Sequence, residues 1–115
     1  MKKLCGENPK YFFQSQSFKM RFCVLDLSLM TFKYAKSPKD TWTEMKMDEI
    51  TFAGPKDQGK EIKVKNLYDL KYLIHLQCEK RTFVFSCNSR SDLIMWQSAF
   101  NAFFKIKEAF LLYSG

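Results

Sequence analysis

Apolar and polar residues alternate along most of the chain up to residue 86, and this period of two predicts short β-strands. The clearest example is residues 18–26, an apolar run that carries a basic pair, Lys19 and Arg21. Residues two apart in a strand share a face, so we expect these two side chains to project together. Arg can give a phosphate two parallel hydrogen bonds and Lys adds a positive charge, so the pair suits an anion. Standing alone, such a pair is more often a solvated sheet edge.

Turn-forming residues divide this region into about seven strands. They are residues 11–13, 18–26, 31–36, 42–47, 50–53, 72–78 and 81–86. The first two and the last two are each predicted to form a hairpin, and Ser37-Pro38-Lys39-Asp40 is predicted to end the third strand. In that third strand Phe32 and Tyr34 share one face and Lys33 lies on the other.

Two stretches have alternative interpretations. Residues 1–9 mix charged residues with Gly and Pro, which indicates either an arm or a short leading strand. Residues 56–69 are polar and rich in Lys, which is typical of a long connection, although the alternation of Ile62 and Val64 also fits an added strand.

The period changes after Asn88, where a helix is predicted over residues 89–113. Ser89 and Asp92 have the spacing of a capping box, in which the hydroxyl and the acid satisfy free amide protons. Apolar residues then recur at spacings of three, four and three, so they form one stripe that must be buried. They are Leu93, Trp96, Phe100 and Phe103.

The end of this helix is more apolar than one buried stripe requires. The additional residues are Phe104, Ile106, Phe110, Leu111 and Leu112. They are predicted either to pack on Leu4 and Tyr11 or to form a surface for a protein partner.

Composition sets the class of the protein. With 115 residues, of which 46% are hydrophobic and 17% aromatic, the chain suits one globular domain with one core. No apolar run is long enough to span a bilayer. The formal net charge of +7 indicates an acidic partner, which leaves a membrane surface, a nucleic acid or an acidic protein.

The four cysteines lack the spacing of a zinc site, and we expect a reduced, cytosolic setting. They are Cys5, Cys23, Cys78 and Cys87. The last three lie in or at the end of strand-like runs and are interpreted as small core residues. Cys5 lies near Lys2 and Lys3, where an S-acyl chain would add membrane affinity. Because position 2 is Lys rather than Gly, the pattern for N-myristoylation is absent.

Few residues suggest catalysis, and we expect neither enzyme activity nor a metal or other cofactor. His75 is the single histidine, and no carboxylate or nucleophile is placed by the sequence to work with it, so we interpret it as a strand residue. A phosphate-cradling glycine loop and a metal-ligand cluster are both missing from the sequence. Nucleic-acid binding ranks last, because no motif for stacking bases on a sheet is present.

Taken together, the strands and the terminal helix resemble a pleckstrin homology domain over nearly the full length of the chain. The matching parts are residues 19–26 for the second strand of the family, residues 32–37 for the third, and Trp96 for the tryptophan of the helix. The resemblance implies a mainly β fold with one C-terminal α-helix, in which two nearly orthogonal antiparallel sheets form a barrel capped by the helix. Residues 1–9 would be an arm, residues 10–86 the barrel and residues 89–113 the helix of a single domain.

Many members of that family bind phosphoinositide headgroups at the open end of the barrel. The resemblance assigns the second-strand basic pair to Lys19 and Arg21, and the third-strand tyrosine to Tyr34. The first-strand basic position falls on Lys10 by spacing, and on Gln14 if Tyr11-Phe12 is aligned with the opening of the family. Loop residues complete the implied rim. They are Lys36, Lys39, Lys80 and Arg81.

The implied function is that of a monomeric, cytoplasmic, peripheral membrane-targeting module that binds a phosphoinositide or another anionic lipid in signalling. The alternative is a protein-interaction or regulatory module of the same fold within a larger signalling protein, with no tight lipid binding. A protein partner is then expected on the C-terminal helix. The sequence does not select one phosphoinositide.

Overall fold

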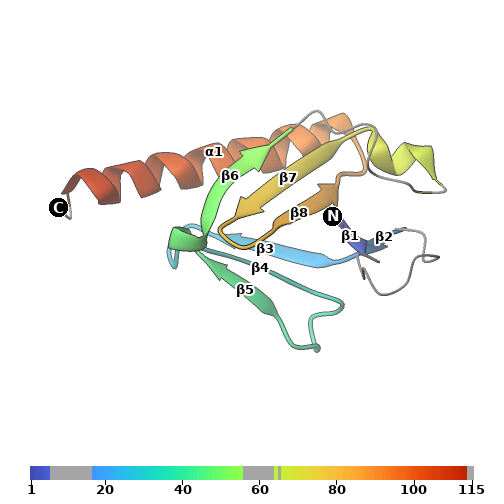
Figure 1. Cartoon of the computed structure of the whole chain (residues 1–115), viewed down its shortest axis with the longest axis horizontal. Coiled ribbons are helices and arrows are strands. Elements are labelled where there is room, and N and C mark those ends of the chain that lie inside the picture. The colour runs from blue at the N-terminus through green and yellow to red at the C-terminus, as the bar shows by residue number, and fades with distance from the viewer. Residues whose placement is uncertain (6–16, 56–63, 65, 114–115) are drawn as a thin grey trace.

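Eight strands in two antiparallel sheets and a long C-terminal helix make up the part of the chain that the computed structural model describes, residues 1–5, 17–55, 64 and 66–113 (Figure 1). The five-stranded sheet has the order β2-β1-β8-β7-β6. Its strands are β1 (Lys2–Cys5), β2 (Ser17–Met20), β6 (Ile50–Gly54), β7 (Leu73–Cys78) and β8 (Thr82–Ser86). The three-stranded sheet consists of β3 (Phe22–Asp26), β4 (Thr31–Ala35) and β5 (Thr43–Lys46). The helices are α1 (Arg90–Tyr113) and two short 3-10 helices, η1 (Met47–Glu49) and η2 (Leu67–Leu70).

The predicted class, mainly β with one C-terminal helix, is confirmed. The hairpin of β7 and β8 has the predicted turn, since Gln77 pairs with Thr82 across Glu79 and Lys80. Strands β4, β5 and β6 also lie where the alternation placed them. Among the described residues of the predicted connection at 56–69, η2 is helical and was not predicted.

The first part of the chain differs from the prediction. Residues 18–26 do not form one strand, because Arg21 lies between β2 of one sheet and β3 of the other. The partner of β2 is β1, with Lys3 opposite Lys19, so residues 2–5 form the short leading strand. The backbone N–H of Arg21 donates to the carbonyl oxygen of Met1 at 2.9 Å and fixes the corner. The predicted partner strand, residues 11–13, lies outside the described residues.

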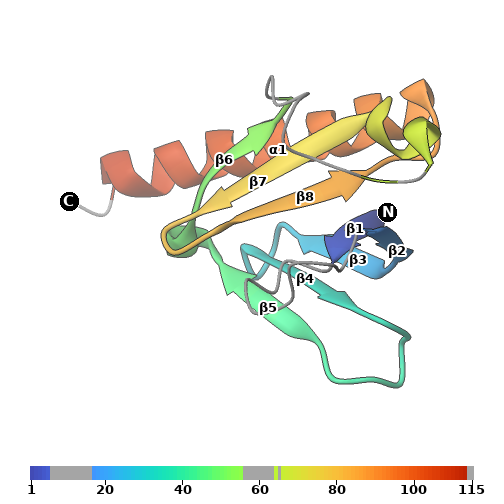
Figure 2. The same cartoon turned by 45° about the vertical axis from the view of Figure 1, so that its right-hand side comes forward.

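The chain passes between the two sheets at two corners. One is Arg21 and the other is η1, and the strands on either side of each corner are edge strands of their sheets. Within the described residues the sheets are therefore joined by covalent connections and do not close into a barrel by a continuous ladder. Figure 2 shows β6, β7 and β8 above β3, β4 and β5, with β1 and β2 beside β3 and the chain passing from β5 to β6 on the left.

The core lies between the sheets and α1, and aromatic rings form its centre. Phe32 of β4 is fully buried, and its ring centroid lies 5.5 Å from that of Phe85 and 5.5 Å from that of Phe100. The predicted helical stripe is confirmed. Phe100 and Phe103 are buried, and the half-buried Leu93 and Trp96 pack against the same cluster.

Helix α1 covers the edge of β6. The side-chain amide of Gln97 donates to the carbonyl oxygen of Ala53 at 3.2 Å, and Lys107 Nζ donates to that of Ile50 at 2.7 Å. These bonds satisfy acceptors that an edge strand would otherwise present to another chain. A side chain at Gly54 would meet Phe52 Cζ at 3.2 Å and Gln97 Oε1 at 3.3 Å, which explains the glycine at this close approach.

The C-terminal turns of α1 extend past the strands (Figure 1). The large apolar residues exposed there are Phe110, Leu111, Leu112 and Tyr113. None of the described helices has both the length and the apolar character needed to cross a membrane.

The N-terminal cap of α1 provides a first testable prediction. The Ser89 hydroxyl accepts the backbone N–H of Asp92 at 3.1 Å, as the capping motif predicted. We expect Ser89→Ala to lower the free energy of unfolding by about 1 kcal/mol, measured by urea denaturation, because one amide loses its partner. Ser91→Ala is the matched control and is expected to be neutral or slightly stabilising, since Ala is the better helix former. Equal effects of the two substitutions would contradict the cap.

Candidate anion-binding site

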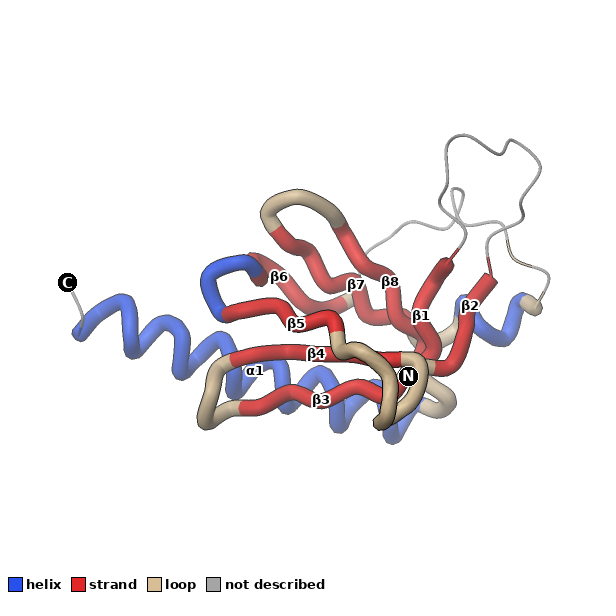
Figure 3. Tube along the Cα trace, turned by 90° about the horizontal axis from the view of Figure 1, so that it is seen from below, coloured by secondary structure: helices blue, strands red, loops and turns tan. Residues whose placement is uncertain are grey.

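A cationic pocket of about 340 Å³ lies where β1, the Arg21 corner, β4 and β5 meet. In Figure 3, β1 and β2 lie beside the ends of β3 and β4 at this place. The lining combines three cationic side chains with one carboxylate, one phenol and two threonines. Its residues are Lys3, Arg21, Tyr34, Ala35, Lys36, Asp40, Thr41 and Thr43.

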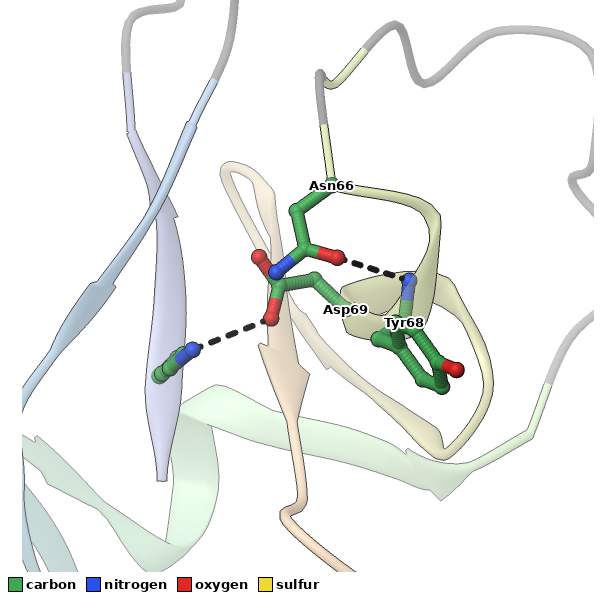
Figure 4. Close-up of polar contacts among 4 residues, drawn as sticks. Asn66, Tyr68 and Asp69 are labelled. Carbon is green, nitrogen blue, oxygen red and sulfur yellow. Dashed lines mark hydrogen bonds and ion pairs between the residues drawn. The ribbon is translucent and has the colours of Figure 1, made fainter.

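Alternation along β1 directs Lys3 into the pocket. Lys2 and Leu4 lie on the opposite face of the strand, where Leu4 packs with Phe18 and Val84. On that face Lys2 Nζ donates to Asp69 Oδ1 of η2 at 3.1 Å (Figure 4). The opposite face therefore has its own small core and ion pair, which leaves Lys3 on the side of the three-stranded sheet.

The η2 helix on that opposite face is ordered by its own cap. Asn66 Oδ1 accepts the backbone N–H of Tyr68 at 3.1 Å (Figure 4). Leu70, the last residue of η2, packs against the small core of Leu4, Phe18 and Val84. These contacts hold β1 from behind and so position Lys3.

Aromatic rings form the floor beneath the lysine. Lys3 Nζ lies 5.4 Å from the ring centroid of Tyr34 and 5.6 Å from that of Phe83. The two rings are 5.9 Å apart and meet edge to face. Cation–π attraction restrains the ammonium group above a rigid apolar surface, where its charge is less screened than in bulk water.

Arg21 enters the pocket from the corner between the sheets. Its guanidinium donates to the carbonyl oxygen of Met20 at 2.8 Å and to Cys5 Sγ at 3.6 Å. A guanidinium has five N–H donors, so these contacts orient the group and leave it able to bind an anion. Among the described residues, no carboxylate lies within ion-pairing distance of Arg21.

The predicted site residues fall into three groups. Arg21, Tyr34 and Lys36 line the pocket together. Two more lie next to it: Lys19 is the cross-strand neighbour of Lys3, and Arg81 Cζ lies 4.2 Å from the centroid of the same Phe83 ring. The third group contains Lys39 and Lys80, which do not line the pocket, and Lys10, which is outside the described residues.

Lys39 and Lys80 are exposed and do not line the pocket. Lys39 lies on the connection between β4 and β5, and Lys80 lies in the turn between β7 and β8. Lys10 and its alternative Gln14 are outside the described residues. The expectation that Lys19 and Arg21 project together from one strand is wrong, because β2 ends at Met20.

The sequence did not predict five residues of the pocket lining, two of them charged, Lys3 and Asp40. Residues 1–9 were predicted to be an arm or a short leading strand, and Lys3 was considered only as a neighbour of Cys5. In the strand alternative, the order Lys2-Lys3-Leu4-Cys5 puts Lys3 on one face and Leu4 on the other. Asp40 was interpreted as a turn residue, which it also is. No sequence signal connected it with Arg21 or Lys3.

The cysteines and the histidine occupy the predicted environments. Burial raises the pKa of the Cys87 thiol to about 11 and also raises the pKa of Cys23 and of Cys78, so all three remain protonated at neutral pH. His75 is fully buried within β7. Cys5 differs, since its half-buried sulfur contacts the guanidinium of Arg21.

Comparisons with protein-family models, with curated proteins and with solved structures find no match to this chain.

Proposed function

We propose that this chain is a membrane-targeting module that binds anionic lipid, phosphoinositide headgroups above all, through the cationic pocket. The observation that carries the proposal is the convergence of Lys3, Arg21 and Lys36 beside Tyr34. These side chains come from three separate elements, so the fold gathers positive charge at a concave place. Concave sites with a few converging polar groups are typical of small-ligand binding.

The charges suit a phosphorylated headgroup. The guanidinium of Arg21 can meet a phosphate with parallel hydrogen bonds, and the two lysines add point charges. Each Lys or Arg near an anionic membrane contributes about 1 kcal/mol of attraction. Lys19 and Arg81 next to the pocket, and the net charge of +7, add to this general attraction.

For the fold we propose an open relative of the pleckstrin homology barrel. Two antiparallel sheets, a terminal helix bearing Trp96 and a cationic opening support this assignment. The resemblance then places the protein in the cytoplasm, where it attaches to the membrane surface in signalling.

A vesicle titration tests the proposed function. The protein is titrated with vesicles of a neutral carrier lipid to which either a phosphoinositide or phosphatidylserine is added at matched total charge, over a series of salt concentrations. We expect the phosphoinositide vesicles to be preferred and the preference to persist at high salt, because contacts in a pocket are screened less than surface charges. Equal binding that declines in parallel for both vesicle types would contradict a headgroup site.

A second candidate function is a protein-interaction module without tight lipid binding. The end of α1 favours it: Leu112 and Tyr113 are 78% and 91% exposed, so apolar surface remains uncovered there. Part of the earlier expectation is corrected, because Phe104 and Ile106 pack against the core. Leu4 packs in the cluster behind β1 and does not cover the helix end, and Tyr11 is outside the described residues. If the protein does not bind vesicles, the result favours this second function, with the exposed end of α1 as the surface for a protein partner.

A further inference from the structure

One carboxylate interrupts the cationic lining of the pocket. Asp40 lies on the connection between β4 and β5 and lines the same pocket as Lys3, Arg21 and Lys36. A carboxylate in the lining weakens the attraction to highly charged headgroups, so Asp40 affects which anionic ligands the pocket accepts in addition to its part in the turn.

A local turn fixes the position of this carboxylate. The Ser37 hydroxyl donates to Asp40 Oδ2 at 2.7 Å, and the backbone N–H of Asp40 donates to the carbonyl oxygen of Ser37 at 3.1 Å. Pro38 presets the backbone of the turn between them. A carboxylate accepts about four hydrogen bonds, so the bond from Ser37 orients Asp40 and leaves it able to accept donors from a ligand.

A second phosphate in this pocket would meet a like charge. Among the described residues of the lining, three side chains are cationic and one, the exposed Asp40, is a carboxylate. One phosphomonoester carries about −1.5 to −2 at neutral pH, so a single phosphate suits the cationic side chains. A second phosphate near Asp40 would be repelled by the carboxylate, at a strength set by a partly solvated site.

The other polar groups suit hydroxyls. An ionised carboxylate only accepts hydrogen bonds, so Asp40 binds a hydroxyl and repels a phosphate oxygen. Thr41, Thr43 and Tyr34 add hydroxyl groups that can donate or accept. The lining thus combines a phosphate-binding part with a part that matches the free hydroxyls of a polyol.

We infer that the pocket selects a polyol phosphomonoester, a ring with one phosphate and neighbouring free hydroxyls, and that Asp40 excludes rings with further phosphates. This inference rests on the proposed function and specifies the class of headgroup. The same chemistry occurs in a singly phosphorylated phosphatidylinositol and in a soluble inositol monophosphate. Asp40 acts here as the specificity-determining residue.

The test compares Asp40→Asn with the wild-type chain. Dissociation constants are measured by calorimetry for soluble inositol phosphates with one and with two phosphomonoesters, and by vesicle titration for the corresponding lipids. We expect the wild type to prefer the single phosphate. Asp40→Asn should shift the ratio of the two affinities about tenfold towards the doubly phosphorylated ligand, as expected for removal of one charge near the second phosphate in a partly solvated site.

Asp48→Asn is the matched control, because it makes the same change of charge at an exposed residue of η1 outside the pocket lining. It should leave the ratio unchanged. A wild type that prefers two phosphates, or an equal shift from both substitutions, would overturn this inference while the proposed function stands. Binding to the lipids but not to the soluble inositol phosphates would show that the ligand is a lipid headgroup. The ratio of affinities for the singly and doubly phosphorylated lipids should then still shift in Asp40→Asn. Vesicles bound without any headgroup preference would overturn the proposed function and this inference together.

Discussion

Phe100→Ala is expected to lower the free energy of unfolding by about 3–5 kcal/mol, the range measured for large-to-small changes at buried aromatic residues. Phe100 is 1% exposed and belongs to the core cluster that α1 forms with strands of both sheets. Its ring centroid is 5.5 Å from that of Phe32 and 6.2 Å from that of Trp96. Removing the ring would leave a cavity between α1 and β4 that neither element can fill without moving.

Trp96→Ala is expected to cost less than Phe100→Ala. The indole is only half-buried, and it meets Phe32 edge to face at 6.3 Å. Both variants can be measured by chemical denaturation with Met95→Ala as the control, since Met95 is 58% exposed on the same helix. If Phe100→Ala were as mild as Met95→Ala, the helix would not be packed on the core as described.

The sequence predicted those elements whose pattern is local. The stripe of α1 repeats at the helical period, and the β7–β8 hairpin alternates on both sides of a polar turn, so neighbouring residues carry the information. Phe32 and Tyr34 were placed on one face of β4 for the same reason. Burial of Phe32 and the position of Tyr34 in the pocket lining agree with that alternation.

The corner at Arg21 could not be predicted in this way. The strand-like pattern of residues 18–26 contains neither Gly nor Pro, and no turn residue in it indicates a change of sheet. The cause is tertiary: β2 pairs with β1 while β3 pairs with β4, and the chain must bend between the two ladders. Arg21 is therefore not a strand residue that shares a face with Lys19. It lies at the corner between the two sheets.

The pocket was predicted in part for a similar reason. Arg21, Tyr34 and Lys36 came from the resemblance, which encodes a three-dimensional arrangement. Lys3 depends on pairing with Lys19 and Phe85, both distant in sequence, and such register is not visible in a four-residue strand. Asp40 is a good turn residue by itself, so its second role emerges only when the turn is placed beside β1.

Arg21→Ala is expected to abolish the preference for phosphoinositide vesicles and to leave the thermal midpoint of unfolding nearly unchanged. Among the described lining residues, Arg21 alone has a guanidinium, which can give a phosphate two parallel hydrogen bonds, so its loss removes more than one unit of charge. Alanine keeps the backbone bond from residue 21 to Met1, which holds the corner. The side-chain bond to Met20 is exposed and contributes little to stability.

Arg90→Ala separates the specific contact from general charge. Arg90 is the exposed first residue of α1 and does not line the pocket, so its substitution removes the same charge without touching the site. Vesicle titrations of both variants at low and at high salt, with thermal unfolding alongside, measure the difference. We expect Arg90→Ala to weaken binding slightly at low salt only, because an exposed charge is screened as ionic strength rises. Equal losses would show that the domain binds through diffuse charge, and unfolding of Arg21→Ala would show that the corner needs the side chain. If Arg21→Ala remains folded and loses the preference for phosphoinositide while Arg90→Ala keeps it, the result supports the pocket as the headgroup-binding site.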